Sequence, residues 1–164
     1  MSASFQTAIN YQPGAAVAGD FASNNPRSNV LAGPGGLVAG AGGVTIGAFC
    51  WVEADGITVL NSGTTAPFGL IGRADMRGII TDYGAGYGFT IPQGYEVTAY
   101  NGGDFWVETT TPATVGQSVF SSTTTGQIAT GAAGATIAGF VQTSFVVASA
   151  GAANSLIKIS SAAI

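Results

Sequence analysis

The chain carries no charged residue between Glu108 and Lys158, and this interval restricts the possible folds more than any other feature. It is rich in Thr, Ser, Val and Gly, whereas Leu, Glu and Lys, which favour helices, are scarce. Without charges, its solubility has to come from Ser, Thr and Gln side chains on the outward faces of strands. The interval therefore predicts β-structure.

Short alternating segments bounded by glycine continue this pattern from residue 44 onward. Residues 44–53 alternate as one strand with two distinct faces, and Asp55-Gly56 predicts a hairpin into the next strand. Asn101-Gly102-Gly103 predicts the tip of a second hairpin, and residues 115–131 predict a third. We therefore expect an all-β fold, a sandwich or barrel of about eight to ten short strands without a long helix.

The first thirty residues differ from the rest, because their large side chains follow neither a helical nor a strand period. The turn signals Gln12-Pro13-Gly14 and Asn24-Asn25-Pro26 interrupt this segment. It is either a frayed terminus or an extended arm that lies on another surface. We expect residues 1–30 to form such an arm and residues 31–164 to form a single β-domain, a size that suits one domain.

Composition excludes several kinds of binding site. A net charge of −4 gives no footprint for nucleic acid, and the absence of His with a single Cys makes a zinc site or an internal disulfide untenable. Pro34 and several glycines interrupt the uncharged stretch after Arg27, so we expect a loop and a strand there rather than a membrane helix. The glycines at 33–43 match no phosphate-binding spacing. No cofactor, nucleic acid or membrane partner is expected.

Carboxylates are the only candidates for catalysis, and their spacing is unfavourable. Asp104 and Glu108 share a strand face with Trp106 between them. Four residues of strand span about 13 Å, more than the roughly 6.5–9.5 Å that an inverting glycosidase needs. Glu53 and Asp55 are closer but lack a supporting polar cluster. We expect no enzymatic activity and no single essential carboxylate.

Two further groups of residues have modest chemical potential. Arg73, Asp75 and Arg77 alternate, so on a strand all three would point the same way, as an edge-strand charge pattern or a contact with a partner. Cys50 lies in an apolar segment, and with no His to activate it we expect a buried thiol rather than a nucleophile.

Three segments resemble the structural cement (capsid decoration) proteins of tailed bacteriophages, and they follow one another in order between residues 5 and 131. They are FQTAINYQPGAAVAGDFASNNPR, LAGPGGLVAGAGGVTIGAFCWV and VGQSVFSSTTTGQIATG. The resemblance implies a compact tulip-like or jelly-roll-like β-domain that binds the outside of the major capsid shell and bridges its subunits. It also implies a virion location after synthesis in the bacterial host cytoplasm, and other copies of the chain, as a dimer or trimer, on the shell.

The arm and one loop are the surfaces that we expect to meet capsid subunits. The aromatic side chains would be buried anchors, and the polar and charged ones would lie at the rim. The predicted interface residues are Phe5, Tyr11, Asp20, Phe21, Asn25, Pro26, Arg27, Arg73 and Arg77. On this hypothesis, deleting residues 1–25 leaves the fold intact and weakens binding to capsids.

Two other classes of function remain open from the sequence. A phage tail, spike or adhesive domain that binds a glycan would suit an exposed Trp51 or Trp106 beside acidic residues. A small esterase or glycosidase is the other, and it lacks both His and a suitable acid pair.

Overall fold

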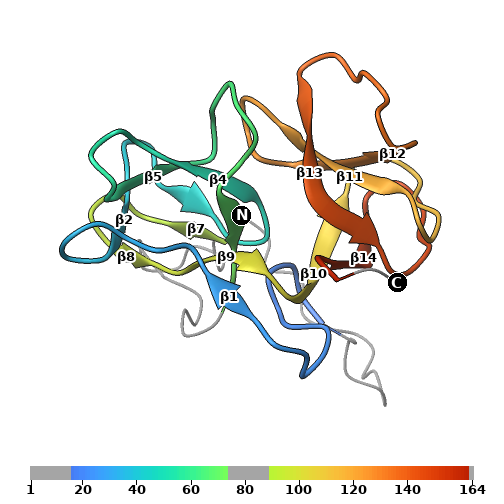
Figure 1. Cartoon of the computed structure of the whole chain (residues 1–164), viewed down its shortest axis with the longest axis horizontal. Coiled ribbons are helices and arrows are strands. Elements are labelled where there is room, and N and C mark those ends of the chain that lie inside the picture. The colour runs from blue at the N-terminus through green and yellow to red at the C-terminus, as the bar shows by residue number, and fades with distance from the viewer. Residues whose placement is uncertain (1–15, 74–88, 163–164) are drawn as a thin grey trace, which may run out of the picture.

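The computed structural model describes residues 16–73 and 89–162, in which every regular element is a β-strand. Two lobes lie side by side and are joined where β9 passes into β10 (Figure 1). We call residues 28–73 and 89–102 the sheet lobe and residues 104–160 the barrel lobe. The prediction of an all-β fold is confirmed.

The sheet lobe is built from very short strands. Its seven-stranded sheet has the order β1-β9-β6-β4-β5-β2-β8, and β3 pairs with β7 beside it. The strands are β1 (Ser28–Asn29), β2 (Leu37–Ala39), β3 (Val44–Thr45), β4 (Phe49–Val52), β5 (Thr58–Leu60), β6 (Gly69–Ile71), β7 (Thr90–Ile91), β8 (Glu96–Val97) and β9 (Ala99–Gly102).

The barrel lobe is a closed barrel with the strand order β10-β12-β11-β13-β14. It contains the uncharged interval, and buried alternate side chains such as Phe105, Val107, Ile157 and Ile159 fill its core. The strands are β10 (Asp104–Thr109), β11 (Ser118–Ser122), β12 (Ile128–Gly131), β13 (Phe140–Val147) and β14 (Ser155–Ser160).

The two lobes have separate apolar cores that meet at one boundary. Phe49, Leu70 and Tyr100 belong to sheet-lobe strands, yet they pack in the same buried cluster as the barrel residues. A second cluster lies wholly within the sheet lobe and includes Cys50 and Val59.

Two expected strand patterns are wrong in detail. The segment 44–53 is broken into β3 and β4 by a turn at Gly47, whose φ of 78° favours glycine, and Trp51 is buried as well as Cys50. The segment around Asn101-Gly102-Gly103 does not form a hairpin, because β9 pairs with β1 and β6 whereas β10 pairs with β12 and β14. At Gly103 the chain instead passes from one lobe to the other. The hairpins at Asp55-Gly56 and at residues 118–131 are confirmed.

Candidate functional site

Residues 17–30, which we call the clasp, run across both lobes. At the barrel lobe, the Gly19 amide donates to the Trp106 carbonyl at 2.8 Å, and the Trp106 amide donates to the Asp20 carbonyl at the same distance. At the sheet lobe, β1 pairs with β9, and the Val30 amide donates to the Ala99 carbonyl at 2.8 Å. The clasp therefore uses backbone hydrogen bonds to tie the lobes together.

The clasp also contributes an aromatic side chain to the core. The Phe21 ring packs edge-on against Tyr100, with centroids 5.3 Å apart, and lies 5.6 Å from the Phe105 ring. The Arg27 guanidinium lies over its outer face, 3.8 Å from the centroid. Phe21 therefore packs against the core of the β-domain, whereas we expected its ring to anchor the arm on another surface.

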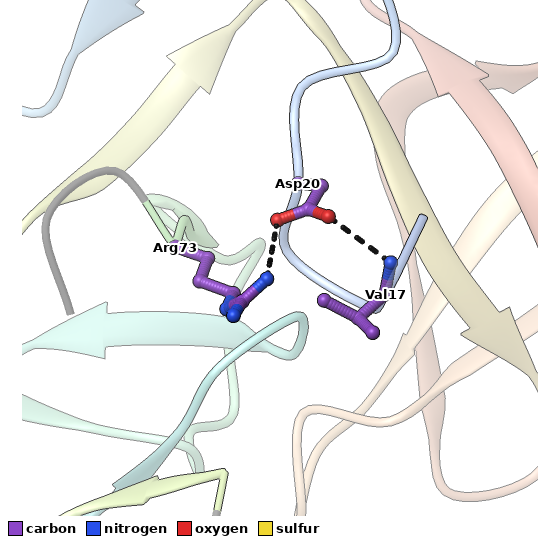
Figure 2. A network of polar contacts seen from close by, with 3 residues as sticks. All are labelled: Val17, Asp20 and Arg73. Atoms are coloured by element: carbon purple, nitrogen blue, oxygen red, sulfur yellow. Dashed lines mark hydrogen bonds and ion pairs between the residues drawn. The ribbon is translucent and has the colours of Figure 1, made fainter. Parts of the chain in front are cut away.

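An ion pair holds the start of the clasp (Figure 2). Arg73 Nη1 lies 3.1 Å from Asp20 Oδ1, and Asp20 Oδ2 accepts a hydrogen bond from the Val17 amide at 3.1 Å. Both side chains are about one-third exposed, with relative exposures of 36% and 33%, so solvent screening keeps this pair weak. The backbone adds a firmer link, because the Arg73 amide donates to the Gly19 carbonyl at 2.9 Å.

Close backbone contact at the same place requires glycine. Gly19 has a φ of 89°, and a Cβ added to Gly47 would lie 2.7 Å from Ala18 Cβ. No side chain fits at either position without moving the clasp away from the sheet lobe.

Asp104 anchors the middle of the clasp from the first residue of β10. Its Oδ2 accepts hydrogen bonds from Ser23 Oγ and from Asn25 Nδ2, both at 2.6 Å. Burial alone raises the pKa of Asp104, but hydrogen bonds from Ser160, Ser23 and Asn25 outweigh it and leave the pKa below its ordinary value. The ionised carboxylate is therefore the form that holds the clasp.

The predicted interface residues thus fall into two groups. Contacts within the chain, at the clasp, are made by Asp20, Phe21, Asn25, Arg27 and Arg73. Pro26 is exposed beside them. Phe5, Tyr11 and Arg77 lie outside the described residues, as does Asp75.

An apolar surface that no periodic pattern of the sequence indicates lies on the sheet lobe. Leu31 is 94% exposed and Phe68 is 52% exposed, and both line a hollow of about 230 Å³. We call this surface the Leu31 patch. Its apolar walls are formed by Val30, Ala32, Val52 and Ala54, with Glu53 as the charged member. A large side chain beside Gly33-Pro34 is the signal that could have indicated it.

The barrel lobe has exposed apolar side chains of its own. Val115 is 56% exposed in the loop before β11, whose Gly116 amide donates to the Val147 carbonyl of β13. Leu156 is 38% exposed and lines a larger cleft of about 450 Å³ together with Phe89 and Glu108. We assign no site to this cleft.

The two tryptophans considered for glycan binding are buried or partly covered. Trp51 is 5% exposed, and its indole N–H donates to the Thr65 carbonyl at 2.8 Å. Trp106 is half-buried with Lys158 Nζ 4.9 Å from its ring centroid. Trp51 therefore offers no open face, and Lys158 covers one face of the partly buried Trp106.

The candidate reactive groups are also buried or hydrogen-bonded within the chain. Burial raises the pKa of the Cys50 thiol to about 12, as expected for an unreactive buried cysteine. Asp55 caps its own hairpin by accepting hydrogen bonds from the Ile57 and Thr58 amides.

Across residues 16–73 and 89–162, no group of three or more His, Cys, Asp or Glu side chains is placed to hold a metal ion. In the same ranges, no helix is long and apolar enough to cross a membrane.

Comparison with known proteins gives the family. The model of the family described as XM1 gp53 minor capsid protein matches residues 5–161. Among solved structures, a chain from the capsid of Myoviridae phage XM1 is 22% identical, and the alignment covers 96% of each chain. Its TM-score of 0.61 indicates a shared fold. No curated protein matches the chain.

Proposed function

Because the chain belongs to the XM1 gp53 minor capsid protein family, we propose that it acts as a cement protein. It binds the outer surface of the major capsid shell and holds neighbouring capsid subunits together. The work is mechanical, and no catalytic step is part of it.

The observation that carries this proposal is one clasped body with exposed apolar side chains on both lobes. Leu31 and Phe68 lie on the sheet lobe, and Val115 lies on the barrel lobe. A protein that bridges two subunits needs two separate contact surfaces and a connection that transmits force between them. The clasp supplies that connection through backbone hydrogen bonds to both lobes.

Multivalency makes weak contacts sufficient. Once one lobe is bound, the second binds as if at a high local concentration, and linked sites gain about 10²–10⁴ in avidity over either alone. Such a gain lets a nearly uncharged β-protein grip a shell without an extensive interface to any single subunit.

The N-terminal residues give a further contact in this proposal. With residues 17–30 committed to the clasp, the arm shortens to residues 1–15, and Phe5 and Tyr11 are its anchors on a neighbouring capsid subunit or on another copy of the chain. Pro26 and Asn25 are exposed and belong to the same proposed contact. On the shell we propose a dimer or trimer as the bound form.

Co-sedimentation with purified empty shells that lack the protein tests the proposal. We expect saturable binding of the unmodified protein, and weaker binding of both Phe68→Ser on the sheet lobe and Val115→Ser on the barrel lobe. Tyr95→Ser is the matched control, because Tyr95 is 54% exposed and lines neither hollow. Unmodified protein that stays in the supernatant at all shell concentrations would refute the cement role.

A further inference from the structure

We propose that the Leu31 patch receives a large apolar side chain of the major capsid protein that is flanked by Lys or Arg residues. The inference rests on the proposed function and goes beyond it by naming the surface and the chemistry of its partner.

Backbone hydrogen bonds hold the segments that carry the patch. The loop that carries Leu31 is fixed by the Val30 amide, which donates to the Ala99 carbonyl at 2.8 Å, and by the Gly33 amide, which donates to the Gly56 carbonyl at 2.7 Å. The Phe68 amide donates to the Cys50 carbonyl at 2.9 Å. Two large apolar side chains are therefore held in water on ordered backbone. A partner that covers them loses little ordering entropy.

The size of the hollow favours a side chain over a small molecule. Small-molecule sites usually have volumes of about 300–1,000 Å³, whereas this one has about 230 Å³. Its apolar walls suit an aromatic or aliphatic group. A rim of exposed Leu31 and Phe68 would exclude water around that group, which is the arrangement of an interface hot spot.

The charges around the hollow define the rest of the partner. Glu53 lines it and is exposed, and Asp55 follows two residues later. Hydrogen bonds from the Thr58 hydroxyl and from the Ile57 and Thr58 amides hold the pKa of Asp55 below its ordinary value, so this rim is anionic at neutral pH. Complementary Lys or Arg residues on the partner would steer it to the patch and fix its orientation.

The cations of the chain itself favour a shell subunit over a second copy as the occupant. In the described residues, Arg27 stacks on Phe21, Arg73 pairs with Asp20, and Lys158 lies over Trp106. Each of the three already has an anionic or aromatic partner within the chain. A second copy that neutralised Glu53 with one of these three cations would have to give up that contact within its own chain.

Binding to shells that lack the protein, measured at several salt concentrations, tests the inference. We expect Leu31→Ser to weaken binding at least about tenfold. We expect Glu53→Lys to weaken it more than Glu53→Gln, and Glu53→Gln to flatten the salt dependence. Tyr95→Ser and Glu108→Lys are the matched controls for an exposed aromatic side chain and for net charge. Equal melting temperatures show that each variant is folded.

The outcomes separate this inference from the cement role. Unmodified protein that fails to bind shells overturns the proposed function. Unmodified protein that binds while Leu31→Ser and Glu53→Lys bind equally well overturns the inference alone. If Leu31→Ser instead abolishes self-association of the free protein, measured by sedimentation equilibrium, and leaves shell binding unchanged, the occupant is a second copy and the inference is likewise overturned.

Discussion

The chain is almost uncharged and must fold in water, and its two lobes do so with different arrangements of strands. The barrel lobe has strands of four to eight residues and closes on itself, so it leaves no open sheet edge. The strands of the sheet lobe have two to four residues, and its edges are the two-residue strands β1 and β8. Length and closure give the barrel lobe internal stability, whereas the sheet lobe depends on its neighbours.

Because the two lobes differ in strand length and closure, the clasp that joins them matters for stability. Phe49, Leu70 and Tyr100 of the sheet lobe pack into the barrel core, and Phe21 of the clasp covers the same boundary. The sheet lobe, which has the shorter strands, also carries the proposed docking surface, the Leu31 patch. Loss of the clasp should therefore affect binding through the shape of the sheet lobe.

Deletion of residues 1–25 should lower the stability of the protein most and should affect the two lobes unequally. It removes Phe21 and every hydrogen bond from Gly19 to Asn25, so we expect a loss of at least about 3 kcal/mol in the free energy of unfolding. Cys50 labelling by a thiol reagent reports opening of the sheet lobe, and amide exchange in β10–β14 reports the barrel lobe. We expect the sheet lobe to lose more protection.

Deletion of residues 1–15 is the control for that experiment. It leaves the clasp in place, so we expect nearly unchanged melting with weaker binding to shells. If the longer deletion melts at the same temperature as the shorter one, the clasp contributes nothing to stability.

Phe21→Ala should cost about 3 kcal/mol, the lower end of the range for a phenylalanine in a core, because its ring is partly buried against Tyr100 and Phe105. Phe68→Ala is the matched change at an exposed ring and should stay within about 0.5 kcal/mol. Chemical denaturation of both variants measures the difference. Equal costs would mean that the clasp ring is not part of the core.

The sequence predicted the barrel lobe better than the sheet lobe, for a physical reason. Alternation and turn glycines specify a strand and its hairpin partner where neighbours in sequence also pair, as at residues 118–131. They do not reveal that β9 and β10 belong to different sheets, because both strands alternate in the same way on either side of Gly103. Phe21 and Leu31 were equally hard to place, since a single large side chain has no period. The family resemblance is confirmed by the match over residues 5–161.

Asp104→Asn should have a smaller effect, on stability rather than on function, for which we expect no single essential carboxylate. The folded-state pKa of Asp104 is lowered, so its stabilising contribution is complete above the unfolded pKa of about 3.9 and is lost as the pH falls through the lower folded value. We expect Asp104→Asn to cost about 1 kcal/mol at neutral pH and to reduce the loss of stability in acid. Unfolding measured from pH 7 to pH 2 tests this, and identical acid profiles would argue against the anchor.

Glu108→Gln should have the smallest effect. Glu108 is exposed on the same strand as Asp104, and no hydrogen bond to its carboxylate is found within the described residues. We expect stability within about 0.5 kcal/mol of the unmodified protein and normal binding to shells. A severe loss of binding would instead place this part of the barrel lobe in the interface.

The heat stability of shells tests the central claim, that one clasped body bridges neighbouring subunits. Shells saturated with unmodified protein should come apart at a higher temperature than bare shells. Shells saturated with Val115→Ser, at a concentration high enough to fill the sites through the sheet lobe, should gain less. If saturating unmodified protein binds the shells and leaves their disruption temperature unchanged, the protein decorates the capsid without cementing it, and the account is contradicted.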